Sequence, residues 1–141
     1  MNVVDANVLV YAVNRDVPEH EASQRWLDDA LSGGATVGFA WVALLAFLRI
    51  VTRAGVLPHP LSVEEAVAVL EAWLAQPAAV LCHPTAQHHT VLAELLTAVG
   101  TGGNLVTDAH LAALAIEHRG AVISFDRDFD RFPGVRCFRP S

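Results

Sequence analysis

Lysine is absent from this chain of 141 residues, and all nine of its basic residues are arginines. Without an ammonium group, P-loop phosphate binding and Schiff-base catalysis are excluded. Fifteen acidic residues give a net charge of −6, which disfavours non-specific electrostatic binding to nucleic acid. A bound metal ion is the remaining way to supply the local positive charge that chemistry at a phosphodiester requires.

Cysteine, basic leader residues and long apolar runs are also scarce. Cys82 and Cys137 are the only cysteines, too few for a disulfide framework. The N-terminus has no basic region, and Asp5 interrupts its first apolar run, so we expect no secretory signal. The longest apolar stretches, residues 39–48 and 111–116, are shorter than a membrane span. We therefore expect no membrane association and a cytoplasmic location.

Apolar residues, in contrast, are abundant, and their spacing predicts alternating strands and helices. A hydrophobic share of 53% favours a folded core, and the length favours one domain over residues 1–141. Strands are predicted at residues 3–4, 36–39, 79–82, 121–125 and 135–138. Helices are predicted at 6–13, from the turn 16–18 to Gly33, at 41–53, at 62–75 with a capping box at Ser62 and Glu65, from Pro84–Thr85 to Gly100, and at 105–118. This alternation is typical of an α/β fold with a mostly parallel central sheet flanked by helices.

Acidic residues lie where such a fold brings distant segments together. Asp5 follows the first strand, Asp126 and Asp128 follow strand 121–125, and Asp108 lies in the first turn of helix 105–118. The functional crevice of a parallel sheet lies outside the carboxyl ends of its strands. Two carboxylates about 4 Å apart repel by about 4 kcal/mol at an effective dielectric near 20. The pattern therefore predicts a divalent-metal site formed by Asp5, Asp108, Asp126 and Asp128.

Three polar residues adjoin these acids in the sequence and are candidates to orient the carboxylates or a metal-bound water. They are Asn7, Thr107 and Ser124. Ordinary turn and cap hydrogen bonds are their alternative role.

Each acid also has a purely local interpretation. Asp5 is suited to cap a helix, Asp108 to interact with a helix dipole, and the acids of residues 126–130 to a solvated turn. An EF-hand is excluded, because in a loop that counts Asp126 as its first position the sixth and twelfth positions are Arg131 and Cys137 instead of glycine and glutamate. The combination of acids at two strand ends and a helix start favours the metal site.

The seven histidines carry weaker signals. His88 and His89 are adjacent and point in different directions on a helix, and Cys82-His83 lacks the paired spacing of a zinc site. Surface and packing roles are expected for the histidines. Ser124 lacks the Gly-x-Ser-x-Gly context of a nucleophile elbow, so a Ser-His-Asp hydrolase is disfavoured.

Four stretches together resemble the PIN-domain ribonucleases, and most closely the VapC-type toxins of bacterial toxin–antitoxin pairs. They are residues 4–9, 47–49, 107–115 and 124–129. The resemblance implies a parallel sheet flanked by helices, Mg²⁺ or Mn²⁺ bound by clustered acids, and hydrolysis of RNA. It also implies a homodimer and neutralisation by a cognate VapB-like antitoxin. Asp5, Asp108 and Asp126 match the acidic positions of the family, with Asp128 as a further candidate ligand.

One position departs from the family pattern. Ala46 stands where the family usually has glutamate, and no acidic residue lies between Asp29 and Glu64 to replace it. Three interpretations follow: a site that works with fewer ligands and more water, a weakened activity, or an engineered inactive variant. Because loss of one carboxylate weakens a second ion most, we expect one well-bound metal.

The leading functional hypothesis is therefore a metal-dependent endoribonuclease. Phosphoryl transfer through Asp5 as nucleophile is disfavoured, because the chain has no lysine near the phosphoryl group. A third hypothesis is a catalytically weakened domain that acts by binding a partner protein through surplus apolar residues, for example in segment 41–48. Residues expected to determine RNA specificity, with surface ion pairing as the alternative, are Arg15, Arg49, Arg53 and Arg127.

Overall fold

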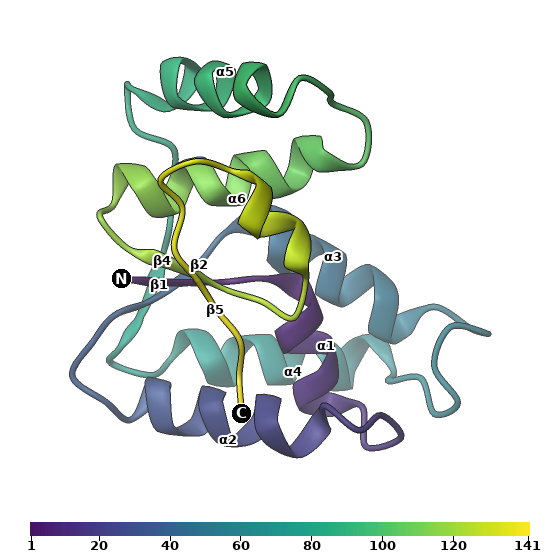
Figure 1. The fold of residues 1–141 in the computed structure, drawn as a ribbon. Coiled ribbons are helices and arrows are strands. Elements are labelled where there is room, and N and C mark those ends of the chain that lie inside the picture. The colour runs from purple at the N-terminus through teal and green to yellow at the C-terminus, as the bar shows by residue number, and fades with distance from the viewer.

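A computed structural model describes all residues from 1 to 141 (Figure 1). Its strands are β1 (Asn2–Val4), β2 (Val37–Phe39), β3 (Ala79–Leu81), β4 (Ala121–Ile123) and β5 (Cys137–Phe138). Its helices are α1 (Ala6–Val13), α2 (His20–Leu31), α3 (Trp41–Thr52), α4 (Val63–Leu74), α5 (His88–Val99) and α6 (Leu105–Glu117), followed by a short 3₁₀ helix, η1 (Arg127–Arg131). No helix combines the length and the apolar character needed to cross a membrane.

The five strands form one sheet in the order β3-β2-β1-β4-β5, and every neighbouring pair is parallel. The predicted α/β class with a parallel sheet is thus confirmed. The chain adds β2 and β3 on one side of β1 and then β4 and β5 on the other side. This change of direction between β1 and β4 is the place where a parallel sheet opens a crevice at its carboxyl edge.

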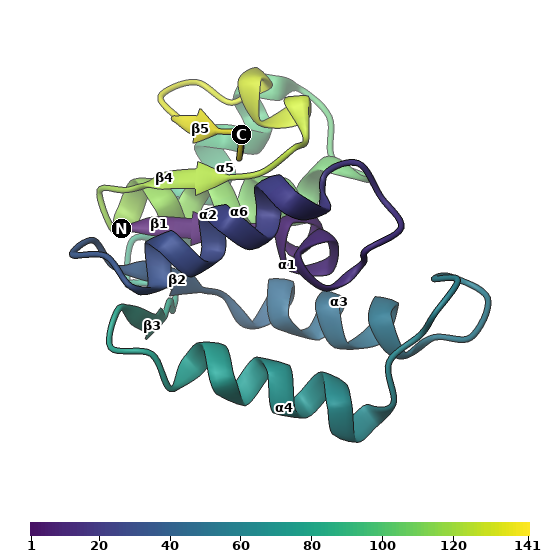
Figure 2. The ribbon, with the colours of Figure 1, turned by 90° about the horizontal axis from the view of Figure 1, so that it is seen from below.

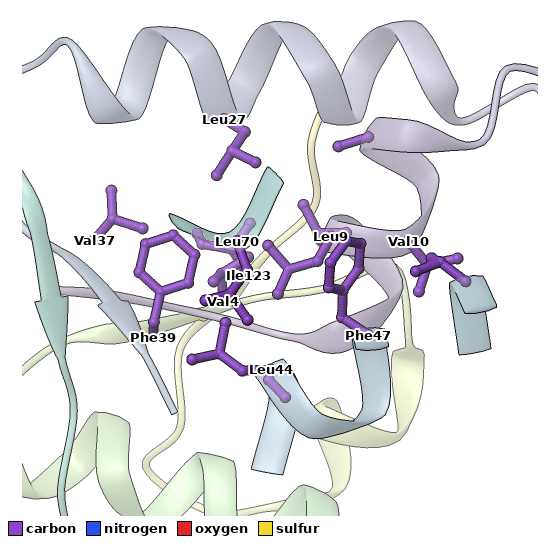
Figure 3. Close-up of a cluster of buried hydrophobic side chains, with 14 of the residues drawn as sticks. Val4, Leu9, Val10, Leu27, Val37, Phe39, Leu44, Phe47, Leu70 and Ile123 are labelled. Atoms are coloured by element: carbon purple, nitrogen blue, oxygen red, sulfur yellow. The ribbon is translucent and has the colours of Figure 1, made fainter. Parts of the chain in front are cut away.

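Helices cover both faces of the sheet. In Figures 1 and 2, α5 and α6 lie on one side of β1 and β4, and α2 and α4 lie on the opposite side. Successive strand residues alternate between the two layers: Val3 and Val122 belong to the core beneath α5 and α6, whereas Val4 and Ile123 belong to the other core. Figure 3 shows Leu27 from α2 gathered with Val4 and Ile123 in this second core.

A close backbone approach places β4 beside β1. The amide of Ala121 donates to the Met1 carbonyl oxygen over 3.0 Å. A Cβ atom at Gly120 would lie only 2.0 Å from that same oxygen, so the position requires glycine. Gly120 thereby lets the two central strands pair, and their carboxyl ends meet at one edge.

The prediction for the start of the fifth helix was wrong. Helix α5 begins at His88 instead of Pro84–Thr85, because Thr85 is engaged elsewhere. Its amide and hydroxyl donate to Glu117 over 2.9 and 2.6 Å, and its hydroxyl accepts from the amide of Gln87. These bonds hold the segment in a turn.

Other element boundaries agree with the sequence to within a few residues. The capping box is present, with the Ser62 hydroxyl accepting from the Glu65 amide. Strand β4 ends at Ile123, two residues earlier than expected, and the turn predicted after it contains the 3₁₀ helix η1. Ser124 still donates its amide to the Phe138 carbonyl oxygen of β5 over 3.0 Å, and the residues directly after it lie outside the sheet.

Candidate metal centre

Three of the four predicted acids meet at the carboxyl edge of the sheet. Asp108 comes from the first turn of α6, and Asp126 and Asp128 come from the start of η1. One carboxylate oxygen from each residue lies within 4.8 Å of the other two. The carboxylate of Asp126 caps η1 by accepting from the amide of Asp128 over 2.8 Å. Asp126 therefore both caps η1 locally and lies close to the carboxylate that Asp108 contributes from α6.

Asp5, the fourth predicted acid, lies beside this group but outside it. Its side chain is buried and caps α1, with Oδ1 accepting from the amide of Ala6 over 2.7 Å. Its Oδ2 accepts from the Ser124 hydroxyl over 2.7 Å and from the Asn7 amide group over 3.1 Å. One oxygen of Asp5 is thus directed to the start of α1, and the other to Ser124 at the end of β4 and to Asn7.

Ser124 and Asn7 connect the two central strand ends. The buried Ser124 hydroxyl donates to Asp5 and accepts from Nδ2 of Asn7 and from the backbone amide of Asp126, both over 3.0 Å. One hydroxyl therefore contacts an acid from each of the two strand ends. Thr107, in contrast, is exposed on α6 and makes no hydrogen bond to these carboxylates.

Burial and mutual repulsion disturb the acids electrostatically. Burial raises the pKa of Asp108 from 3.8 to about 7, and the charges of Asp5, Asp126 and Asp128 add to this rise. Burial also raises the pKa of Asp5, although hydrogen bonds from Ser124 and Ala6 oppose it. Without a cation, burial and the neighbouring acids therefore disfavour the ionised form of Asp108.

The donor set fits a hard divalent cation. Mg²⁺ binds oxygens at about 2.0–2.1 Å, so two of its ligands lie at most about 4.2 Å apart. The oxygens of Asp108, Asp126 and Asp128 fall within 4.8 Å, and small side-chain rotations would close them around such an ion. Carboxylate ligands without cysteine or histidine favour Mg²⁺ or Mn²⁺ over softer metals.

Helix α3 contributes no carboxylate to the centre. It contains no acidic residue, and Ala46 lies half-buried on it.

A second polar network was not predicted from the sequence. His88 Nδ1 contacts Glu117 Oε2 over 2.5 Å, and His88 Nε2 contacts His110 Nδ1 over 2.8 Å. Burial raises the pKa of Glu117, but hydrogen bonds from Thr85 and His88 outweigh this effect and lower it overall. The network ties α5 to α6, so these histidines are neither solvent-exposed nor simple packing residues. The partners of His88 lie 22 and 29 residues away, and no local spacing signals them.

The whole arrangement corresponds to a known family. A sequence profile described as the PIN domain matches residues 3–135. The chain belongs to the PIN-domain family. This confirms the resemblance seen in the sequence.

Individual PIN-domain proteins are similar over almost their full length. Ribonuclease VapC37 of Mycobacterium tuberculosis is 58% identical over 140 residues, which cover 99% of this chain and 97% of the relative. Ribonuclease VapC33 of the same organism is 37% identical, with 99% and 98% covered.

Two solved structures share the fold of this PIN domain. VapBC2 from Rickettsia felis, bound to a DNA fragment from its promoter, superposes with a TM-score of 0.72 at 17% identity, covering 99% of this chain and 98% of that one. VapC20 of M. tuberculosis, a toxin that cleaves the sarcin–ricin loop, has a TM-score of 0.69 at 20% identity, with 96% and 99% covered.

Proposed function

We propose that this PIN domain is a metal-dependent endoribonuclease toxin that hydrolyses RNA phosphodiesters and is neutralised by a VapB-like antitoxin. The group of carboxylates from Asp108, Asp126 and Asp128 carries the proposal, because a divalent cation bound among them would offset their mutual repulsion. The 58% identity to a protein named a ribonuclease supports the substrate class. The fold shared with VapBC2 supports an antitoxin partner.

Asp108, Asp126 and Asp128 would hold one Mg²⁺ or Mn²⁺ ion, and Asp5, beside them, would add its negative charge to the attraction for the ion. When bound, such an ion lowers the pKa of a coordinated water and neutralises charge that develops on the phosphate. Two-metal chemistry needs further ligands, and α3 supplies none. We therefore propose a single well-held ion.

The residues around the acids position them. Ser124 holds the Asp5 carboxylate and the Asp126 backbone through one hydroxyl, and Asn7 holds both Asp5 and Ser124. With these bonds in place, the acids need little rearrangement when substrate and ion bind, and such preorganisation lowers the cost of reaching the transition state. Asn7 and Ser124 are accordingly proposed as positioning residues.

The alanine at position 46 supports a second proposed function, in which a catalytically weakened domain acts mainly by binding a partner protein. Helix α3 lacks the acid that the family usually carries there, and it exposes Trp41 and Leu45 by 44% and 56%. These side chains, one helical turn apart, would suit an apolar contact with another protein chain.

The proposed reaction is tested by cleavage of a synthetic RNA stem–loop while Mg²⁺ or Mn²⁺ is titrated. Asp126→Asn retains a residue suited to cap η1 but removes a charge from the centre, and we expect at least about 100-fold slower cleavage. Asp28→Asn, an exposed change on α2, is the matched control and should cleave normally. Equal cleavage by the Asp126→Asn variant and the unmodified protein would refute the metal centre.

The antitoxin and the assembly need separate measurements. Addition of the cognate antitoxin should stop cleavage stoichiometrically, and light scattering should report a homodimer of this chain. A chain that binds the antitoxin tightly but cleaves no RNA at any metal concentration would favour the partner-binding role.

A further inference from the structure

None of the nine arginines forms an ion pair. The only two ion pairs in the structure join histidines to acids, His59 to Asp16 and His88 to Glu117. Surface ion pairing, the alternative role for Arg127, is therefore absent. In a chain with fifteen acidic residues, guanidinium groups without a carboxylate partner are available for an external anion.

Arg139 is one of these groups, and an aromatic ring holds it in place. Its guanidinium carbon lies 5.2 Å from the centroid of the Phe125 ring, a cation–π geometry. Tyr11 packs edge-on against the same ring, with 5.4 Å between the ring centroids. The stacking positions the guanidinium of Arg139 without using its N–H donors. The one hydrogen bond that an arginine side chain donates within the chain comes from Arg136 instead.

Arg139 and Arg127 line the same cavity, which adjoins the metal centre. The cavity measures about 220 Å³, and Ser124, Phe125 and Asp126 form part of its wall. Asp126 is thus shared between the cavity and the group of three carboxylates. Asp130 also lines the cavity. Like Arg127 and Arg139 it is exposed to solvent, where salt screens all three charges.

We propose that this cavity binds a backbone phosphate of the RNA strand next to the phosphate that is cleaved. Arg127 and Arg139 are its phosphate ligands, because the planar guanidinium fork matches two phosphate oxygens. The subsite answers the difficulty that a net charge of −6 presents to RNA binding, since it supplies positive charge beside the acids. The inference rests on the proposed endoribonuclease function and adds residues that the metal chemistry does not require.

The test is binding of a fluorescent phosphorothioate RNA of about eight nucleotides, which resists hydrolysis, followed by anisotropy with Mg²⁺ and with EDTA. Arg127→Gln and Arg139→Gln should each raise Kd by about five- to tenfold and lower the salt slope by about one. Arg139→Lys retains the charge and should lose only about two- to threefold.

Arg136→Gln is the matched control. Arg136 precedes β5, and its side chain donates to the Gly120 carbonyl oxygen, just before β4, over 3.4 Å. It does not line the cavity, so its Kd should stay within about twofold of the original. Phe125→Leu removes the ring without changing the charge, and it should weaken binding by a smaller factor than Arg139→Gln. Circular dichroism melts establish that each variant is folded.

The outcomes separate the subsite from the proposed function. Unchanged Kd in both glutamine variants overturns the subsite, even if the protein cleaves RNA normally. Loss of binding in these variants, in a protein that cleaves no RNA, retains the subsite and overturns the nuclease. If the original chain binds no RNA under either condition, the subsite is wrong. In an active protein, cleavage by Arg139→Gln should show a raised KM with kcat changed much less.

Discussion

Replacing Asp108 by asparagine should stabilise the metal-free protein, although it removes a proposed ligand. The pKa of this carboxyl rises from 3.8 to about 7 in the folded protein. Each tenfold change in acid dissociation corresponds to about 1.4 kcal/mol, so full ionisation would cost the folded state about 4 kcal/mol. Because the carboxyl is partly exposed, we halve this figure and expect a gain of about 2 kcal/mol in the Asp108→Asn variant.

The sign of the effect depends on pH. Between pH 3.8 and about 7, the folded protein keeps a proton on Asp108 that the unfolded chain has lost. The free energy of unfolding therefore falls across this window as pH rises. Asparagine cannot ionise, so the difference between variant and original should be near zero at pH 4 and largest above pH 7.

Urea unfolding in EDTA at pH 4, 6 and 8, followed by circular dichroism, measures this difference. Asp28→Asn is the control and should stay within about 0.5 kcal/mol at every pH. Saturation with Mg²⁺ at about 100 times Kd should add about 2.7 kcal/mol to the original protein and much less to Asp108→Asn. A variant that is less stable than the original at pH 8 in EDTA, or equally shifted at all three pH values, would refute the electrostatic account.

Three further substitutions test other parts of the structure. Asp5→Asn keeps a helix-capping side chain but removes a negative charge from the centre. RNA cleavage should therefore fall by at least about 100-fold, while the melting temperature changes little. Unchanged cleavage would exclude Asp5 from the site. Ala46→Glu restores the acid usual in the family, and half-maximal cleavage should occur at a lower Mg²⁺ concentration; an unchanged or higher requirement would argue that α3 is too far from the ion. Glu117→Gln replaces a nearly inaccessible carboxylate that accepts hydrogen bonds from Thr85 and His88, and it should lower the free energy of unfolding by about 1–3 kcal/mol. Amide hydrogens of α5 should exchange faster in this variant. Unchanged exchange in α5 would show that the network does not hold this helix.

The architecture was accessible from the sequence because its signals are local. Apolar periodicity, the capping box at Ser62 and the glycines after helices each act within a few residues of the chain. The start of α5 was misplaced because Thr85 bonds to Glu117, 32 residues away. A propensity argument has no access to such a partner.

The candidate site was predictable to the extent that it follows from strand ends. Asp5 and Asp126 had to share one edge once β1 and β4 were parallel neighbours. The sequence predicted Asp5, Asp108 and Asp126 as ligands, with Asp128 as a further candidate. The fold brings oxygens of Asp108, Asp126 and Asp128 together, and Asp5 lies beside them, bonded to Ser124. The positions of the carboxylates depend in part on side-chain hydrogen bonds between residues that are more than a hundred positions apart in the sequence.

By itself, the sequence determined the alternation of strands and helices, the acids at their ends, the lack of lysine and the missing acid at Ala46. These properties depend on residue identity and short-range spacing. Only the tertiary structure decided that the pKa of Asp108 is raised to about 7. It also decided that no arginine forms an ion pair with an acid, and that the guanidinium of Arg139 stacks on the Phe125 ring. Burial, repulsion and stacking all depend on distances between groups, and the folded chain alone sets those distances.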